Sequence, residues 1–329
     1  MTRSNGGIIG PDNIPTMLTA SGVWGLPEQE LAQLDSIWPI VLSGRGIFGG
    51  GNTGSNSNVI DYVIIDTAGN AVDFGDITVA TNSIAACSNL TKGFFGGGYG
   101  ANYTSAITQI TISTAGNSTS FGSLTVARLG LGACSNGTRG VFGGGTTGSN
   151  SNVIDYITLS TAGNAIDFGD LTIARYDLSA CAGGSRGVFG GGRTTTYVNV
   201  IDYITITTSV GATDFGDLTV ARESLASCSD GSRGIWAGGY TGSAQNVIDY
   251  VTIATTGNAT DFGDLAVALW GPAGCSNTTR GVIGGNIVAG AQNVINYITI
   301  ATTGNATDFG DLTVGRNLLG ACAEFYGTT

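Results

Sequence analysis

Six cysteines recur along this chain at a constant interval of 47 residues. They are Cys87, Cys134, Cys181, Cys228, Cys275 and Cys322. Six phenylalanines keep the same interval: Phe74, Phe121, Phe168, Phe215, Phe262 and Phe309. Because no copy carries an insertion or a deletion, residues from about 44 to 325 form an array of six equal units. A period of roughly 40–50 residues is typical of β-propeller blades.

One unit, residues 124–170, contains four short segments with the composition of β-strands. We expect strands at residues 131–135, 140–144, 153–159 and 165–171, separated by clusters of Gly, Asn, Ser and Thr. The third segment is largely apolar on both faces, so neighbouring blades must cover both. The sequence therefore predicts an all-β, six-bladed propeller with four-stranded blades.

The array begins and ends out of phase with its blades. It opens at residues 44–48, which match a second strand, and it closes at residues 318–322, which match a first strand. We therefore expect the C-terminal strand to complete blade 1 as its innermost strand, which leaves no open edge in the ring. This gives two regions, an N-terminal extension over residues 1–43 and the propeller over residues 44–329.

The unit resembles a kelch repeat. Kelch families place a basic residue before the innermost strand, a Gly-Gly pair at the end of the second strand, and aromatics in the third and fourth. Arg128, Gly143–Gly145, Tyr156 and Phe168 occupy those places here. The chain departs from the family in having Phe instead of Trp in the fourth strand and no His after the basic residue. The resemblance implies a propeller fold and an interaction role.

Variation among the copies concentrates on one predicted face. The turn between the third and fourth strands is nearly constant, whereas the loops between the second and third strands, and those leading into each first strand, differ. These two variable loop types share one face of a four-stranded blade. On that face we expect a candidate binding surface made of Tyr99, Tyr103, Tyr176, Arg193, Tyr197, Tyr240 and Trp270. Exposed aromatics suit sugar stacking or protein contact; the alternative is that these solvent loops vary freely and bind nothing.

The residue types argue against an enzyme. The chain has no His, which excludes Ser-His-Asp and Cys-His sites, and its few Glu residues do not repeat in the core of the units. We expect no catalytic residue, no cofactor and no metal. The six cysteines occupy equivalent places in six blades, so we expect them to be free and buried rather than paired.

Acidic residues repeat at three positions of the unit, represented by Asp155, Asp167 and Asp170. Repeat 2 replaces all three, with Thr108, Ser120 and Ser123, which suggests that the three positions share an environment. We interpret them as turn and backbone hydrogen-bonding residues; the alternative is one calcium site per blade. A conserved ion pair between the third-strand Asp and the Arg that opens each repeat is not expected. Thr81 and Leu269 replace that Arg, while Thr108 and Asn296 replace the Asp, which we interpret as unmatched losses.

The charge balance limits the partners. The formal net charge is −11, with only 12 Lys and Arg residues, so we expect no nucleic-acid binding. The sequence has no apolar run long enough to span a membrane, and its first 15 residues have no apolar signal core. We therefore expect that the protein does not insert into a membrane. We expect it to be assembled in a host cytoplasm.

Residues 1–43 lie outside the repeats. They resemble short segments of structural and tail-appendage proteins of tailed bacteriophages, with the residues SGVW, L, EQ and WP in that order. Docking to a particle would use Trp24, Leu26, Leu31 and Trp38. The alternative is a strap that packs against the propeller, and the two interpretations are compatible.

These features together predict a non-enzymatic virion structural protein that is tail- or fibre-associated and takes part in host attachment. Its partners would be other virion proteins and a host surface glycan. The alternative is a bacterial kelch-like protein-interaction module or adhesin. A particle protein and a cellular module would differ in location, which the sequence does not specify.

Overall fold

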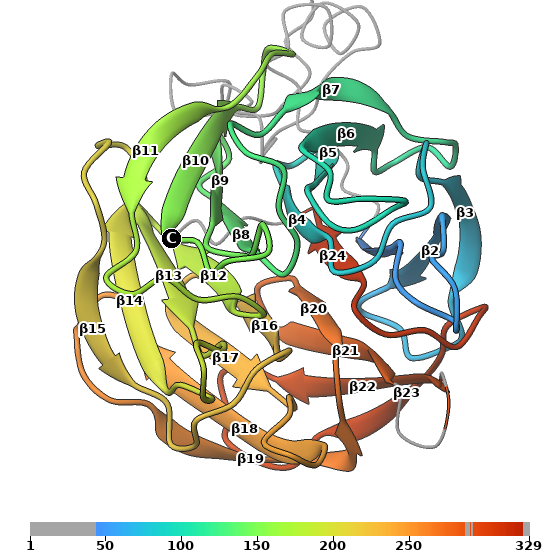
Figure 1. Ribbon diagram of the computed structural model, residues 1–329. Helices are drawn as coiled ribbons and strands as arrows, with labels where there is room; N and C mark the ends of the chain where they lie inside the picture. Colours follow the sequence, from blue (N-terminus) through green and yellow to red (C-terminus); the bar gives the residue numbers. More distant parts are fainter. Residues whose placement is uncertain (1–43, 287–289, 291, 325–329) are drawn as a thin grey trace, which may run out of the picture. The chain divides into compact units, whose positions relative to one another are not determined.

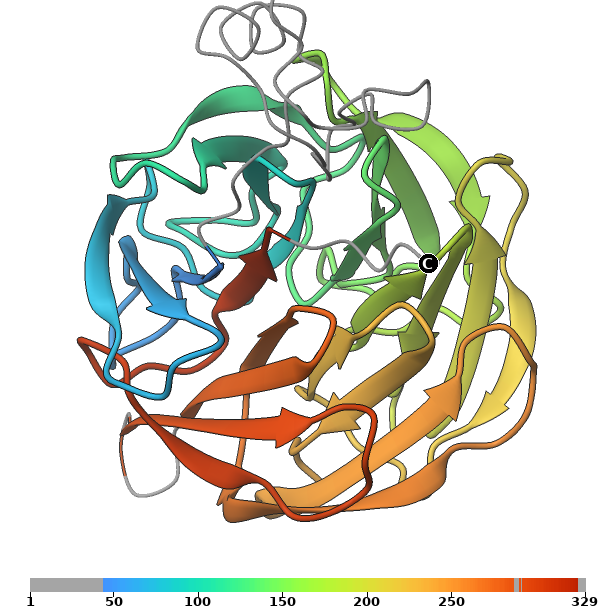
Figure 2. The same cartoon turned by 180° about the vertical axis from the view of Figure 1, so that it is seen from behind.

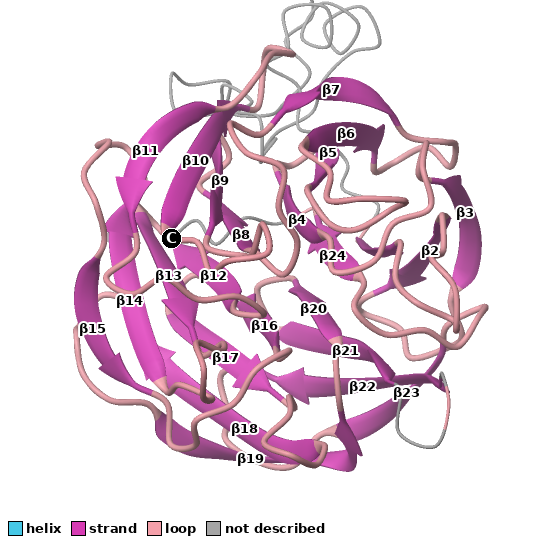
Figure 3. Ribbon diagram, viewed as in Figure 1, coloured by secondary structure: helices cyan, strands magenta, loops and turns pink. Residues whose placement is uncertain are grey.

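The computed structural model describes residues 44–286, 290 and 292–324. Its regular secondary structure consists of β-strands, arranged as six four-stranded antiparallel sheets around a common axis (Figure 1). The strands are connected by loops and turns throughout the described part of the chain (Figure 3). The predicted all-β, six-bladed propeller is therefore confirmed.

Each blade runs from an inner strand to an outer strand. Blade 1 comprises β24 (Gly320–Ala323), β1 (Arg45–Gly49), β2 (Val59–Ile64) and β3 (Val72–Asp76). Blade 2 comprises β4 (Ala85–Ser88), β5 (Lys92–Gly96), β6 (Ala106–Thr111) and β7 (Thr119–Ser123). Blade 3 comprises β8 (Gly132–Ser135), β9 (Arg139–Gly143), β10 (Val153–Thr158) and β11 (Ile166–Asp170).

The other three blades repeat this order. Blade 4 comprises β12 (Ser179–Gly183), β13 (Arg186–Gly190), β14 (Val200–Thr205) and β15 (Thr213–Asp217). Blade 5 comprises β16 (Ala226–Ser229), β17 (Arg233–Ala237), β18 (Gln245–Thr252) and β19 (Thr260–Leu269). Blade 6 comprises β20 (Ala273–Ser276), β21 (Arg280–Asn286), β22 (Gln292–Thr299) and β23 (Thr307–Asp311). In blade 3, the predicted strands match the observed ones to within one residue at each end.

The ring closes as predicted, because β24 pairs with β1 in antiparallel register. Figure 2 shows β24, in red, beside the blue strands of blade 1. The backbone N–H of Gly44 also donates to the Glu324 carboxylate at 2.9 Å, which ties the two ends of the propeller together. Strands from opposite ends of the described chain thus form one blade, in which β24 covers the inner edge of β1.

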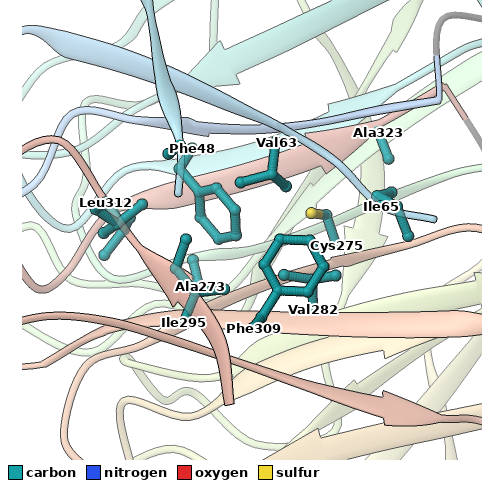
Figure 4. Close-up of a cluster of buried hydrophobic side chains, with 12 residues drawn as sticks. Phe48, Val63, Ile65, Ala273, Cys275, Val282, Ile295, Phe309, Leu312 and Ala323 are labelled. Carbon is teal, nitrogen blue, oxygen red and sulfur yellow. The ribbon is translucent and has the colours of Figure 1, made fainter. Parts of the chain in front are cut away.

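The hydrophobic core lies between blades rather than within any one of them. In one cluster, Phe48 and Val63 of blade 1 pack with Val282 and Phe309 of blade 6 (Figure 4). Five further clusters hold the remaining buried side chains, and each draws on neighbouring blades in the same way. A single blade therefore has no core of its own, which explains why both faces of the third strand are apolar.

Each cysteine lies against a glycine of the next blade. A Cβ built on Gly187 would lie 2.7 Å from Sγ of Cys134, well inside van der Waals contact. The same pairing recurs around the ring as Gly46 with Cys275, Gly93 with Cys322, Gly140 with Cys87, Gly234 with Cys181, and Gly281 with Cys228. All six thiols are free and buried, and burial raises the pKa of Cys134 to about 12. The repeated cysteines therefore have a packing role at the blade interfaces.

Replacing Gly187 with Ala should destabilise the propeller by about 1–3 kcal/mol, because the new methyl group overpacks the contact with Cys134. Adding Cys134→Ala removes the sulfur and should restore most of the lost free energy of unfolding. Gly163→Ala is the matched control, because a Cβ there would meet no atom within 4 Å. Urea denaturation followed by circular dichroism would measure all three, and equal midpoints for Gly187→Ala and Gly163→Ala would contradict the packing role.

A second contact of this kind explains one irregular repeat. Gly143 lies against the ring of Phe189, and Gly190 lies against the ring of Trp236, each time one blade further on. Blade 5 has Ala237 at this position, and the aromatic residue of blade 6 is replaced by Ile283; these two residues pack in one cluster. The larger residue on one blade is thus matched by a smaller one on the next.

The constant turn between the third and fourth strands also serves the blade interface. The side-chain oxygen of its Asn accepts a hydrogen bond from the backbone of the preceding blade's outer strand, as in Ser123 N–H to Asn164 at 3.1 Å. The same bond joins Asp76 to Asn117, Asp217 to Asn258, Asp264 to Asn305 and Asp311 to Asn70. Repetition of this turn therefore reflects stacking of blades.

Candidate binding face

The two variable loop types meet on one face of the propeller, as predicted. The backbone of Tyr176, which leads into β12, pairs with that of Arg193 in the loop between β13 and β14. Arg193 pairs in turn with Tyr197 across the same loop. In blade 5, Glu223 pairs with Tyr240 in the same way. The loop backbones are therefore held by antiparallel hydrogen bonds, which fixes the positions from which the side chains project.

Four of the predicted residues form a continuous row, which we call the aromatic strip: Arg193, Tyr197, Tyr240 and Trp270. The Arg193 guanidinium carbon lies 5.2 Å from the centre of the Tyr197 ring. The Tyr197 and Tyr240 rings meet edge to face at 6.1 Å, and Tyr240 stacks on Trp270 at 4.5 Å with 27° between the ring planes. Each of these side chains is partly exposed, and the strip crosses blades 4, 5 and 6.

The other three predicted residues divide between two places. Tyr176 adjoins the aromatic strip through its backbone pairing with Arg193. Tyr99 and Tyr103 belong to blade 2, where their rings meet edge to face at 5.6 Å with 38% and 39% of each residue exposed. The seven residues share one face but make two groups, and only the group on blades 4 to 6 spans several blades.

Glu223 is a charged residue of this face that was not predicted as part of the binding surface. It is 5% exposed, and one carboxylate oxygen lies 3.4 Å from Nη1 of Arg193. The other oxygen, Oε2, is buried without a hydrogen-bond partner. Burial raises the pKa of the Glu223 carboxyl, and Arg193 partly opposes that rise. The sequence could have indicated that Glu223 belongs to this surface, because it occupies the position equivalent to Tyr176 and Trp270.

The mouth of the axial channel on this face is narrowed by a closed ring of backbone hydrogen bonds. Six residues at 47-residue spacing each donate N–H to the carbonyl of the previous one, over 2.6–3.1 Å: Ser83, Gly130, Asp177, Ser224, Gly271 and Leu318. All six have φ between 51° and 70°. These six residues, together with Ile, Leu, Ala and Gly residues at the start of the inner strands, line a cavity of about 100 Å³. This arrangement holds the inner ends of the blades together.

Asp177 is the acidic member of that ring, and burial raises its pKa to about 7, with the charge of Glu223 acting in the same direction. A carboxyl whose folded-state pKa is raised destabilises the fold as pH rises above its unfolded pKa, so stability should fall from about pH 4 to about pH 7. Because Asp177 is partly exposed, we expect Asp177→Asn to stabilise the protein by only about 1–2 kcal/mol more at pH 8 than at pH 5. Asn also tolerates the left-handed backbone at this position. Urea denaturation at both pH values measures the difference, and a pH-independent effect of the substitution would contradict it.

The repeated third-strand Asp residues form buried ion pairs, contrary to the expectation from the sequence. Arg175 Nη1 lies 2.7 Å from Oδ2 of Asp202, and both side chains are fully buried. The same pair occurs as Arg128 with Asp155, Arg222 with Asp249, and Arg316 with Asp61. A threonine at the start of the connecting segment also bonds the same carboxylate, as Thr172 does with Asp202. The third-strand Asp is therefore a structural partner of the opening Arg.

The Arg and the Asp are replaced in the same blades, so the interpretation that their losses are unmatched was wrong. Three of the Arg residues pair with the Asp 27 residues later, in the blade whose inner strand the Arg precedes. Arg316 pairs with Asp61, because blade 1 takes its inner strand from the C-terminal end of the propeller. Thr81 and Thr108 have this separation in blade 2, and so do Leu269 and Asn296 in blade 6. Both partners are thus replaced together, which avoids a lone buried charge.

The three acidic positions also do not share one environment. Asp155 and Asp167 are cross-strand neighbours, beside an irregularity in the pairing of β10 and β11, yet Asp155 is fully buried and Asp167 is exposed. Among residues 44–286, 290 and 292–324, no three His, Cys, Asp or Glu side chains are placed to hold a metal ion. Within those residues, no helix is long and apolar enough to cross a lipid bilayer.

The predicted docking residues, Trp24, Leu26, Leu31 and Trp38, lie outside the described residues. No protein-family model matches the chain. No curated protein matches it significantly. The fold and the geometry of the loop face are therefore the observations from which a function must be inferred.

Proposed function

We propose that the chain is a non-enzymatic structural protein of a tailed-phage virion, tail- or fibre-associated. Its propeller presents the loop face to a host surface glycan or to another virion protein, and residues 1–43 dock it to the particle. The aromatic strip carries this proposal, because it places partly exposed rings from three blades on one hydrogen-bonded face. Rigid aromatic side chains supply contact area at low cost in conformational entropy.

The kelch-like interpretation of the repeat belongs to the same proposal. Tyr156 and Phe168, at the kelch aromatic positions, meet edge to face at 6.1 Å, and Arg139 lies over the Tyr156 ring at 4.4 Å. These contacts support a scaffold role for the repeat, with recognition assigned to the loops. Kelch-type propellers without catalytic residues are suited to binding rather than to chemistry.

The charge of the chain supports the assignment of partners. A net charge of −11 favours neither nucleic acid nor an anionic membrane surface. Binding to virion proteins or to surface glycans does not require clustered basic residues. The proposed location is the virion, after assembly in the host cytoplasm.

Antibody labelling of particles from the source lysate, viewed by electron microscopy, tests the proposal. The expected result is label at a tail, a fibre or a capsid vertex, with the label abolished when the antibody is first absorbed with purified protein. Protein found free in the lysate or on cells, with no labelled particle, would reject it. A bacterial kelch-like interaction module or adhesin would then be the better account.

A further inference from the structure

We propose that the junction of blades 4, 5 and 6 binds a neutral sugar ring, using the aromatic strip as a stacking platform and Glu223 with Arg193 as its polar contacts. This inference rests on the proposed function, because it names the ligand class of the same loop face. The two halves of the site come from different observations, the ring contacts and a buried carboxylate oxygen without a partner.

The three rings of the aromatic strip provide the apolar half of the site. Tyr197, Tyr240 and Trp270 contact one another in sequence and remain partly exposed. One face of a pyranose presents C–H groups that pack on the face of an aromatic ring. Because each ring is braced by the next, stacking a sugar here requires little rearrangement.

Glu223 provides the polar half. Its Oε2 atom is buried and accepts no hydrogen bond, while Oε1 lies 3.4 Å from Arg193. A buried acceptor without a donor carries a desolvation cost. Rotation of the carboxylate toward the loop face would let a ligand hydroxyl donate to Oε2 and relieve that cost. Arg193, with 38% of its side chain exposed, can donate to a ring or hydroxyl oxygen at the same place.

The charges select a neutral ligand over an anionic one. Arg193 and Glu223 offset each other, so the site offers no excess positive charge to a carboxylate, sulfate or phosphate. The unpartnered oxygen of Glu223 needs a hydrogen-bond donor and would repel an anion. The net charge of the chain acts in the same direction.

At the equivalent junction of blades 1 and 2, the position of Glu223 is occupied by Asn82, whose side chain is already hydrogen-bonded. There the side chain of Asn82 donates to Asn56, and Asn56 donates to the carbonyl of Gly100 at 2.8 Å. Its polar side chains are thus occupied by one another, although Tyr99 and Tyr103 lie close by in blade 2. Tyr99 occupies the position equivalent to Tyr240, which makes it a matched control site.

The test uses the full chain on an array of immobilised oligosaccharides, with galactose-, glucose- and mannose-terminated glycans beside sialylated ones. Glycans that bind are then measured by calorimetry. Trp270→Ala and Glu223→Gln should each weaken binding of a neutral glycan about tenfold, through loss of a stacking ring and of a charged hydrogen-bond acceptor. Tyr99→Ala should bind as the wild type does, and thermal melting checks that every variant is folded.

Three results would overturn the inference: no glycan binding by the wild type, preferential binding of sialylated glycans, or equal binding by all the variants. Label on virions without glycan binding would overturn the sugar site and leave the proposed function standing. Glycan binding that is lost in the two site variants, without label on particles, would uphold the sugar site and reject the virion assignment.

Discussion

A chain that ends at Leu319 should lose most of its stability, because it lacks β24, the inner strand of blade 1. That strand pairs with β1 over four residues, from Gly49 with Gly320 to Gly46 with Ala323. The lost strand also includes Cys322, which fills the contact with Gly93 of blade 2. The deletion therefore opens the ring where its two ends meet.

The expected loss is about 4–6 kcal/mol, from strand hydrogen bonds worth about 1 kcal/mol each and from the buried side chains. Since small domains are stable by only about 5–15 kcal/mol, the truncated chain should be largely unfolded or aggregated. Aggregation is favoured because the inner edge of β1 would present unpaired N–H and C=O groups.

A chain that ends at Glu324 is the matched control, because it keeps β24 and the hydrogen bond between Gly44 and Glu324. Circular dichroism during urea denaturation, with gel filtration of the same samples, measures both chains. A truncated chain that stays monomeric and unfolds at the midpoint of the control would show that β24 does not close the ring.

The closure and the blade boundaries could be predicted because they depend on the order of strands along the chain. Strict periodicity fixed the number of blades, and the change of composition at each turn fixed the strand limits. The contacts between blades could not be predicted in the same way. That Gly187 lies against Cys134, and Gly190 against Trp236, depends on the stagger of neighbouring sheets, which a repeat pattern does not contain.

The loop face was predictable from its variation, but the arrangement of its side chains was not. The sequence placed Tyr99 and Tyr240 at equivalent positions, and only the three-dimensional structure separates the pair on blade 2 from the strip on blades 4 to 6. Glu223 was not predicted, because its burial depends on the packing of neighbouring loops, which the repeat pattern does not contain. The hydrogen-bonded ring at the channel mouth was hidden because residues as different as Asp177 and Leu318 share its left-handed backbone conformation.

The buried ion pairs were present in the sequence as a covariation. Thr81 precedes Thr108 by the same 27 residues that separate Arg175 from Asp202, and so does Leu269 from Asn296. Blade 6 also has Ala266 where Thr172 bonds the Asp of blade 4. The whole network is absent from blade 6, whereas blade 2 keeps Thr78 at the threonine position and lacks only the Arg and the Asp. It is therefore the two charged members that are kept or lost together.

Replacing one partner of such a pair should therefore cost more than replacing both. In blade 4, Arg175→Leu leaves the Asp202 carboxylate buried without its cation, and Asp202→Asn leaves the Arg175 guanidinium without its anion. Each single change should lower the free energy of unfolding by about 3–5 kcal/mol. The double variant reproduces the Leu and Asn of blade 6, and it should recover at least about 2 kcal/mol relative to the sum of the single effects.

A double-mutant cycle measured by urea denaturation tests this expectation. Lys92→Leu is a control for loss of a partly exposed cation, because its ammonium contacts the neutral Gln109 side chain at 3.1 Å, and it should change stability by less than about 1 kcal/mol. Additive effects of Arg175→Leu and Asp202→Asn would mean that the two side chains stabilise the blade independently. A coupling of the expected size would instead explain why both replacements occur together in blades 2 and 6, since a blade that loses one charge remains stable only when it also loses the other.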